Sequence, residues 1–156
     1  MWQRIQTVFL IIVVLAMATT VFLPLWVSQV DGSLSYELYP LHFTIRTGTE
    51  TTTEYFPYAI TAILAVASAT IAFIEIGKFK DRVVQMKLGA LNALLMAAVV
   101  GCAVYFANQK IQQYDAGIWQ YGFGLYAPII AVVANFFANR FIRRDERLVR
   151  DSERLR

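Results

Sequence analysis

Four long apolar blocks dominate this chain and restrict what it can fold into. Each is close to the ~20 residues that an α-helix needs to cross the ~30 Å hydrocarbon layer of a bilayer. Of the 156 residues, 58% are hydrophobic and only 16% are charged, against about 25% charged in ordinary soluble domains. We therefore predict an all-α membrane protein, a bundle of four transmembrane helices over residues 5–26, 58–76, 88–106 and 122–141.

Lysine and arginine are distributed unevenly between these blocks. Arg4 precedes the first block, four basic residues lie between the second and third, and seven Arg follow from the end of the fourth. The two remaining segments hold only Arg46 and Lys110. Because basic residues stay on the cytoplasmic side of a membrane, both termini and the loop 77–87 are predicted to be cytoplasmic. An even number of spans agrees with this orientation.

The first block also has features of a secretory signal. Arg4, an apolar stretch and the small residues of Ala16–Ala18 could form a cleavable leader. The apolar run continues past that site to Leu25, so a permanent helix is expected. The transmembrane domain then covers residues 1–142.

The segment 27–57 is the largest piece predicted outside the membrane. Apolar and polar residues alternate over 34–38 and again over 41–45, which is typical of short strands. Turn residues flank both stretches, as "DG" and "TGT". We predict a small extracytoplasmic β-hairpin between the first two helices. It could be a solvated lid, or its edge could pair with a strand of a partner protein.

Aromatic residues gather near the ends of the spans, where amphipathic rings favour the headgroup layer. We interpret them as an aromatic belt, with a carbohydrate or cofactor platform as the alternative. The residues are Trp2, Trp26, Tyr55, Tyr58, Tyr114, Trp119, Tyr121, Phe123 and Tyr126.

Small residues recur every four positions along the third span, at Gly89, Ala93, Ala97 and Gly101. Residues with this spacing share a helix face, and small side chains allow membrane helices to approach closely. We predict that these four residues pack a tight bundle within one chain. Homodimerisation through the same face is the alternative.

Glu75 is the only acidic residue within a predicted span. An intramembrane carboxylate is a functional candidate by default, for instance in a proton relay. Since it lies one turn from the cytoplasmic end, we expect it to reach the interface or to pair with Lys78 or Lys80. Asn92 and Asn135 are expected to hydrogen-bond between helices.

Motifs for catalysis or cofactor binding are absent from the sequence. His42 is the only histidine and Cys102 the only cysteine, so they cannot form a zinc or haem ligand set. We therefore expect no cofactor and no enzymatic activity. An enzyme acting on lipid would need Glu75 close to Tyr105 or Asn92.

The charged tail, residues 143–156, is predicted to continue the fourth helix into the cytoplasm. Arg140, Arg143, Arg144 and Arg147 are expected to anchor the inner end and to contact anionic lipid, at about 1 kcal/mol per basic residue. A cytoplasmic protein partner is a second possible role. Nucleic acid is not an expected partner, because four acidic residues interrupt the arginines.

Four stretches resemble one family of small bacterial four-helix membrane proteins, catalogued as the domain of unknown function DUF4293. They read "MWQRIQTVFL", "YFPYAITAILA", "FKDRVVQMKLGALN" and "YGFGLYAPIIAVVANFFANRFIRRDERLVRDSERLR". The resemblance covers nearly the whole chain, and the loop 27–54 is its least characteristic part. It implies a protein of the bacterial cell envelope and transfers no catalytic residues.

These observations favour a non-catalytic accessory or assembly subunit of a larger inner-membrane complex. Its partner would bind through the outer hairpin or the charged tail. The alternative is a small transporter or channel, with Glu75, Asn92 and Asn135 lining a path. A Glu75 side chain that faces the bundle interior and lines a hydrated cavity would favour the alternative.

Overall fold

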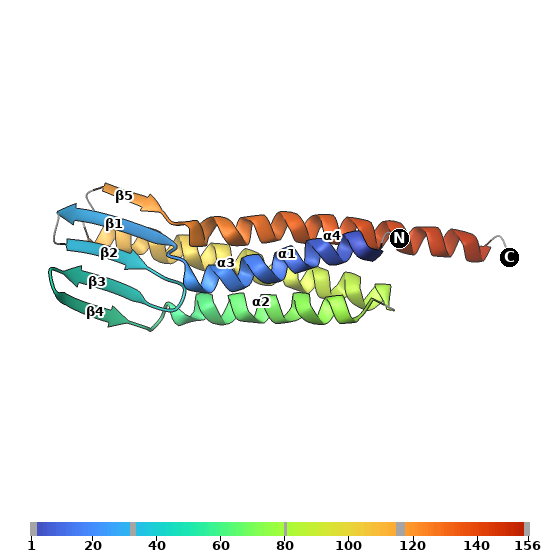
Figure 1. Ribbon diagram of the computed structural model, residues 1–156, viewed down its shortest axis with the longest axis horizontal. Helices are drawn as coiled ribbons and strands as arrows, with labels where there is room; N and C mark the ends of the chain where they lie inside the picture. The colour runs from blue at the N-terminus through green and yellow to red at the C-terminus, as the bar shows by residue number, and fades with distance from the viewer. Residues whose placement is uncertain (1–2, 32–33, 80, 115–117, 155–156) are drawn as a thin grey trace.

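The computed structural model describes residues 3–31, 34–79, 81–114 and 118–154. Four long helices run side by side, with a β-sheet at one end of the bundle (Figure 1). Each helix contains a stretch long and apolar enough to cross a membrane, which agrees with the four predicted spans. The helices are α1 (Gln3–Phe22), α2 (Ala59–Gly77), α3 (Arg82–Gln113) and α4 (Phe123–Arg154).

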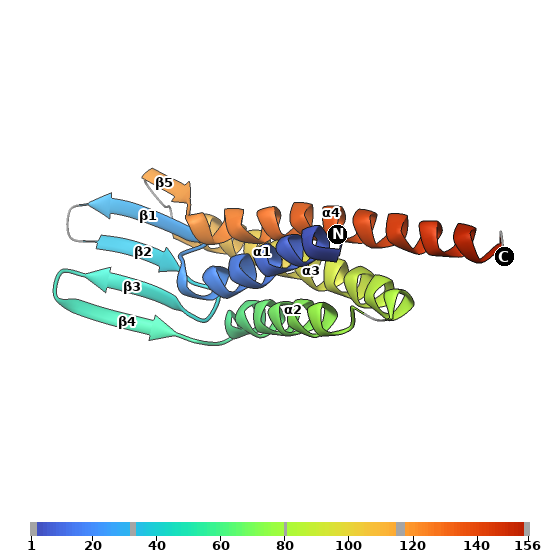
Figure 2. The same cartoon turned by 45° about the vertical axis from the view of Figure 1, so that its right-hand side comes forward.

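The helices alternate in direction around the bundle. Both α1 and α3 pack between α2 and α4. The start of α1, the α2–α3 connection and the end of α4 lie together, opposite the sheet (Figures 1 and 2). We call this the basic end and the opposite end the sheet end. At the basic end α4 projects beyond the other three helices.

The sheet has five antiparallel strands, where two were predicted. The predicted hairpin corresponds to β2 and β3, which pair with each other, and further strands extend it on both sides in the order β4-β3-β2-β1-β5. The last strand comes from the segment between α3 and α4 and pairs with β1. The sheet therefore joins the α1–α2 and α3–α4 connections of the chain. Its strands are β1 (Trp26–Asp31), β2 (Leu34–Leu38), β3 (Phe43–Thr47), β4 (Glu50–Glu54) and β5 (Ile118–Tyr121).

The predicted first span is too long at its outer end. Helix α1 ends at Phe22, because Pro24 has no N–H to continue it. The Pro24 carbonyl instead accepts a hydrogen bond from the backbone N–H of Gly124 at 3.0 Å. A Cβ at Gly124 would come within 3 Å of that oxygen, so only glycine allows this junction to pack against the start of α4.

The inward face of the sheet packs on the outer end of α3. Trp26, Leu38 and Phe43 are fully buried there, against Phe106 and Ala107 of the helix. Helix α3 has 32 residues, about 48 Å of helix, and extends beyond the predicted span on both sides. The contact with the sheet explains the extension at the sheet end.

The aromatic belt is correspondingly smaller than predicted. Trp26 and Tyr58 are buried in the core beneath the sheet. Trp119 and Tyr121 belong to β5, and Trp2 lies outside the described residues. Exposed rings near the sheet end are those of Tyr55, Trp119, Phe123 and Tyr126, and Tyr114 is half-buried.

Candidate functional site

Buried polar side chains link the helices in the half of the bundle nearer the basic end. The Ser68 hydroxyl of α2 donates to Asn92 Oδ1 of α3 at 2.6 Å. The Asn135 Nδ2 of α4 donates to the backbone oxygen of Gly89 at 3.0 Å. Asn92 and Asn135 are thus each engaged by one interhelical hydrogen bond. Such bonds contribute about 0.6 kcal/mol on average in membrane proteins.

Glu75 lies inside the bundle, not at its surface. Its side chain is fully buried, and neither carboxylate oxygen has a hydrogen-bond partner among the described residues. Gln85 of α3 contacts the Glu75 backbone instead, because its Nε2 donates to the backbone oxygen of Glu75 at 2.9 Å. The Oε1 of Gln85 is also buried without a described partner.

The expectation that Glu75 reaches the interface or pairs with Lys78 is wrong. Glu75 follows Ser68 and Ala72 on the buried face of α2 at helical spacing, so the helix directs its side chain into the bundle. Lys78 lies past the end of the helix and is exposed, and Lys80 falls outside the described residues. A buried carboxylate without a partner costs several kcal/mol in its charged form, which makes Glu75 the strongest functional candidate in the spans.

The predicted packing stripe on α3 does not form one contact face. Gly89 is buried and Ala93 is half-buried, but Ala97 and Gly101 are exposed. Residues four apart rotate by about 40° per step on a helix of 3.6 residues per turn, so the stripe turns by about 120° before it reaches Gly101. A Cβ at Gly89 would overlap the Asn139 side chain of α4, whereas one at Gly101 would meet nothing within 4 Å.

The residues of α3 that pack against the other elements are spaced alternately four and three positions apart. This heptad spacing keeps side chains on the inner face of helices that cross at a shallow left-handed angle. Its members are Gln85, Gly89, Asn92, Met96, Val99, Ala103, Phe106 and Lys110.

The last member of that face, Lys110, forms a second polar site, which the sequence analysis missed. The side chain is only 6% exposed. Its ammonium lies 4.4 Å from the centre of the Phe43 ring and 5.0 Å from that of Tyr114. It also lies 3.8 Å from Glu54 Oε2 of β4. Continuation of the four-and-three spacing to position 110 was the signal that could have identified it.

The four predicted anchor arginines line one groove on α4. Arg140, Arg143, Arg144 and Arg147 are all exposed, and the groove encloses about 610 Å³. The remaining lining residues are Phe136, Asn139 and Phe141.

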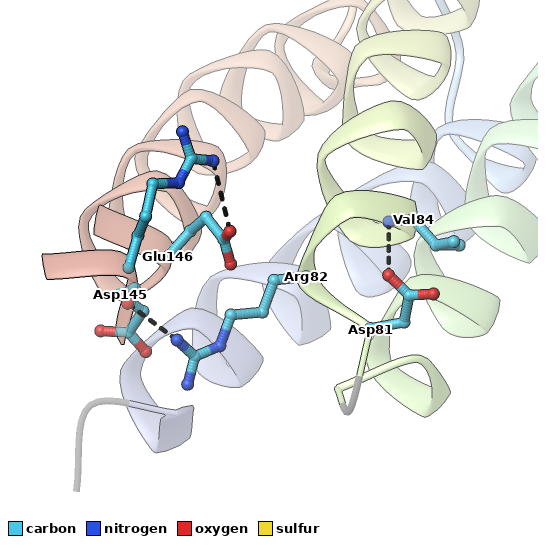
Figure 3. Close-up of polar contacts among 6 residues, drawn as sticks. Asp81, Arg82, Val84, Asp145 and Glu146 are labelled. Carbon is cyan, nitrogen blue, oxygen red and sulfur yellow. Dashed lines mark hydrogen bonds and ion pairs between the residues drawn. The ribbon is translucent and has the colours of Figure 1, made fainter. Parts of the chain in front are cut away.

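The start of the tail is fixed to α3 (Figure 3). The Arg82 guanidinium donates to the backbone oxygen of Asp145 at 2.7 Å. The neighbouring Asp81 caps α3, because its Oδ1 accepts from the N–H of Val84 at 3.0 Å. On the tail, Glu146 and Arg150 form an ion pair at 3.4 Å. The tail therefore leaves the bundle in a defined direction.

The residues that a lipid-modifying enzyme would need are far apart. Gln85 of α3 lies beside Glu75, because the two residues are hydrogen-bonded. Tyr105 is twenty residues further along α3, about 30 Å from Gln85 along the helix axis. The Tyr105 side chain is 63% exposed, and Asn92 is bonded to Ser68. Among the described residues, no group of three His, Cys, Asp or Glu is placed to hold a metal ion.

One protein-family model matches nearly the whole chain. The family model described as "Domain of unknown function (DUF4293)" matches residues 2–155. The chain belongs to this family. The match confirms the resemblance seen in the sequence and covers the helices and sheet of the DUF4293 protein together. No curated protein matches the chain.

Proposed function

We propose that this DUF4293 protein is a non-catalytic accessory or assembly subunit of a bacterial inner-membrane complex. The observation that carries the proposal is strand β4. It is an edge strand of the sheet, and all five of its residues are exposed. Edge strands offer unpaired backbone N–H and C=O groups to a strand of another chain. The partner would therefore be a membrane protein with an extended segment outside the bilayer.

The proposed orientation places the sheet outside the cell and the basic end in the cytoplasm. It rests on the charge distribution, since Lys110 and Arg46 are the only Lys or Arg in the two outer segments. Single cysteines at Thr49 and Asp151, in a Cys102→Ala background, would test it in intact spheroplasts. A membrane-impermeant maleimide is expected to label position 49 and to leave position 151 unlabelled. The opposite pattern contradicts the orientation.

The subunit role is tested by photo-crosslinking in cells. A photoreactive residue at Thr52, in the middle of β4, is expected to capture one membrane protein at a stoichiometric level. The same residue at Ala97, which is exposed on α3, serves as the matched control and should capture little. Equal capture at both positions would contradict the proposal. So would a purified monomer that transports solutes on its own.

The burial of Glu75 favours a second candidate, a small transporter or channel. Intramembrane carboxylates without a structural partner commonly mark ion or proton paths. Proteoliposomes loaded with a pH-sensitive or cation-sensitive dye would test this role. Transport by the wild-type chain that disappears in Glu75→Gln supports the transporter, and absence of flux in both leaves the subunit role as the better account.

A further inference from the structure

We propose that the arginine groove on α4 binds the phosphate headgroup of one anionic phospholipid from the surrounding bilayer. The four arginines Arg140, Arg143, Arg144 and Arg147 follow each other at steps of three, one and three residues and line the same groove. The first and last are separated by about 10 Å along the helix axis. Guanidinium groups bind phosphate through paired N–H donors.

The groove lies where a headgroup would lie. The residues from Phe123 to Ile142 form about 30 Å of helix, one hydrocarbon thickness. Ile142 is fully buried in the bundle, Arg82 at the start of α3 contacts Asp145, and the end of α4 projects past the other helices (Figure 2). Arg143 therefore falls at the boundary between the hydrocarbon and the headgroups.

The floor of the groove is apolar and open to lipid on one side. Phe141 stacks on Phe9 of α1 with ring centres 5.7 Å apart, which fixes the wall next to the bundle. Phe136 is 62% exposed and lies one turn before Arg140. This ring provides an apolar surface for an acyl chain below a bound headgroup, which neither a soluble anion nor a nucleic acid requires.

Three other polar groups near the groove have partners within the protein. Glu146 pairs with Arg150, and the Asp145 carbonyl accepts from Arg82. The Asn139 Nδ2 donates to the Asn135 backbone oxygen at 3.1 Å. The groove offers a phosphate the guanidinium groups of Arg140, Arg143 and Arg147, in a basic pocket at the membrane surface of the kind that recognises anionic lipid headgroups.

The test is native mass spectrometry of the full chain in neutral detergent, with cardiolipin, phosphatidylglycerol or phosphatidylcholine added in turn. We expect one anionic lipid retained per chain and no comparable retention of phosphatidylcholine. Replacement of Arg140, Arg143 and Arg147 together by Gln should weaken retention by about tenfold or more. The control Lys78→Gln, which removes an exposed cation outside the groove, should change it less than about twofold.

The triple Gln variant could also alter membrane insertion, so a second variant carries Lys at the same three positions. It keeps the charge and loses the paired donors, and we expect correct insertion with weakened lipid retention. Retention equal to that of the wild type in both variants would overturn the proposal. So would equal binding of free glycerol phosphate, or tighter binding of a short DNA duplex than of lipid. None of these outcomes depends on a partner at the sheet, so the subunit proposal stands or falls separately.

Discussion

The Lys110 ammonium of α3 lies 4.4 Å from the centre of the Phe43 ring of β3. The same ammonium reaches Glu54 of β4 and donates to Gln113 Oε1 at 3.2 Å. One buried cation thus connects two strands of the sheet to the helix beneath them. The sheet is held on the bundle by this contact and by the apolar cluster around Trp26.

Replacement of Lys110 by Met should loosen the sheet from α3. Methionine has a similar length but loses the attraction to the rings, which contributes up to about 2 kcal/mol when the cation is desolvated. We expect the free energy of unfolding in detergent to fall by about 1–2 kcal/mol. Proteolysis within residues 34–54 should also become faster. The control Arg46→Met removes an ion pair with Glu37 in which the Arg46 side chain is 54% exposed, and it should change stability by less than about 1 kcal/mol. An unchanged K110M variant would contradict the role assigned to Lys110.

Two glycines of α3 should respond in opposite ways to the same substitution. Gly89→Ala forces the Asn139 side chain to move and should destabilise the bundle by about 1–3 kcal/mol. Gly101→Ala meets open space and should stabilise the helix by up to about 1 kcal/mol. Thermal unfolding of both variants in one detergent makes the comparison direct. An equal loss of stability in both variants would instead support the predicted stripe of Gly89, Ala93, Ala97 and Gly101 as the packing face.

Replacement of Glu75 by Gln should stabilise the bundle. The amide has nearly the same shape, and it removes a carboxylate that lacks a described partner, a change expected to gain about 1–3 kcal/mol. Chemical unfolding in detergent measures this gain. The control Glu50→Gln lies on exposed β4 and should stay within about 0.5 kcal/mol of the wild type. A large loss of stability in E75Q would indicate a structural partner for the carboxylate.

Tyr39 should make the sheet end sensitive to alkaline pH. Burial, together with the hydrogen bond to Glu37 Oε2 at 3.1 Å, raises the pKa of the Tyr39 phenol above its usual value. A pKa raised on folding stabilises the protein below the unfolded value of about 10, and this stability is lost as the pH rises through the folded pKa. Phenylalanine has no proton to lose. The free energy of unfolding of Tyr39→Phe should therefore fall less than that of the wild type between about pH 9 and pH 12. Tyr126→Phe, which removes an exposed hydroxyl, is the matched control, and identical pH profiles for all three proteins would contradict the prediction.

The helices could be predicted because each span is a long apolar run, and the bilayer requires such runs. The inward face of α2 could not be predicted in the same way. Its sequence is apolar almost all round, so hydropathy does not distinguish the side facing lipid from the side facing protein. Only the common face that Ser68 and Ala72 share with Glu75 contains this information, and it becomes visible once α1 and α3 are packed against α2.

The sheet shows a different limit of sequence reasoning. Apolar and polar residues alternate clearly in β2 and β3. Strand β4 reads "ETTTE" and has no apolar residue, so the two-residue periodicity of a strand cannot be seen in it. Trp26 continues the apolar run of α1, and such a run does not distinguish a helix from a buried strand. Strand β5 is only four residues long and depends on its pairing with β1, a contact between residues about ninety positions apart.

That pairing has a consequence for the biogenesis of the protein. Strand β1 is synthesised early, but its outer neighbour β5 emerges only after α3 has been made. Until then β1 carries an open edge, which closes when the second helical hairpin has entered the bilayer. Completion of the sheet is therefore coupled to completion of insertion, and a chain stalled after two crossings would expose the edge of β1 to quality-control proteases.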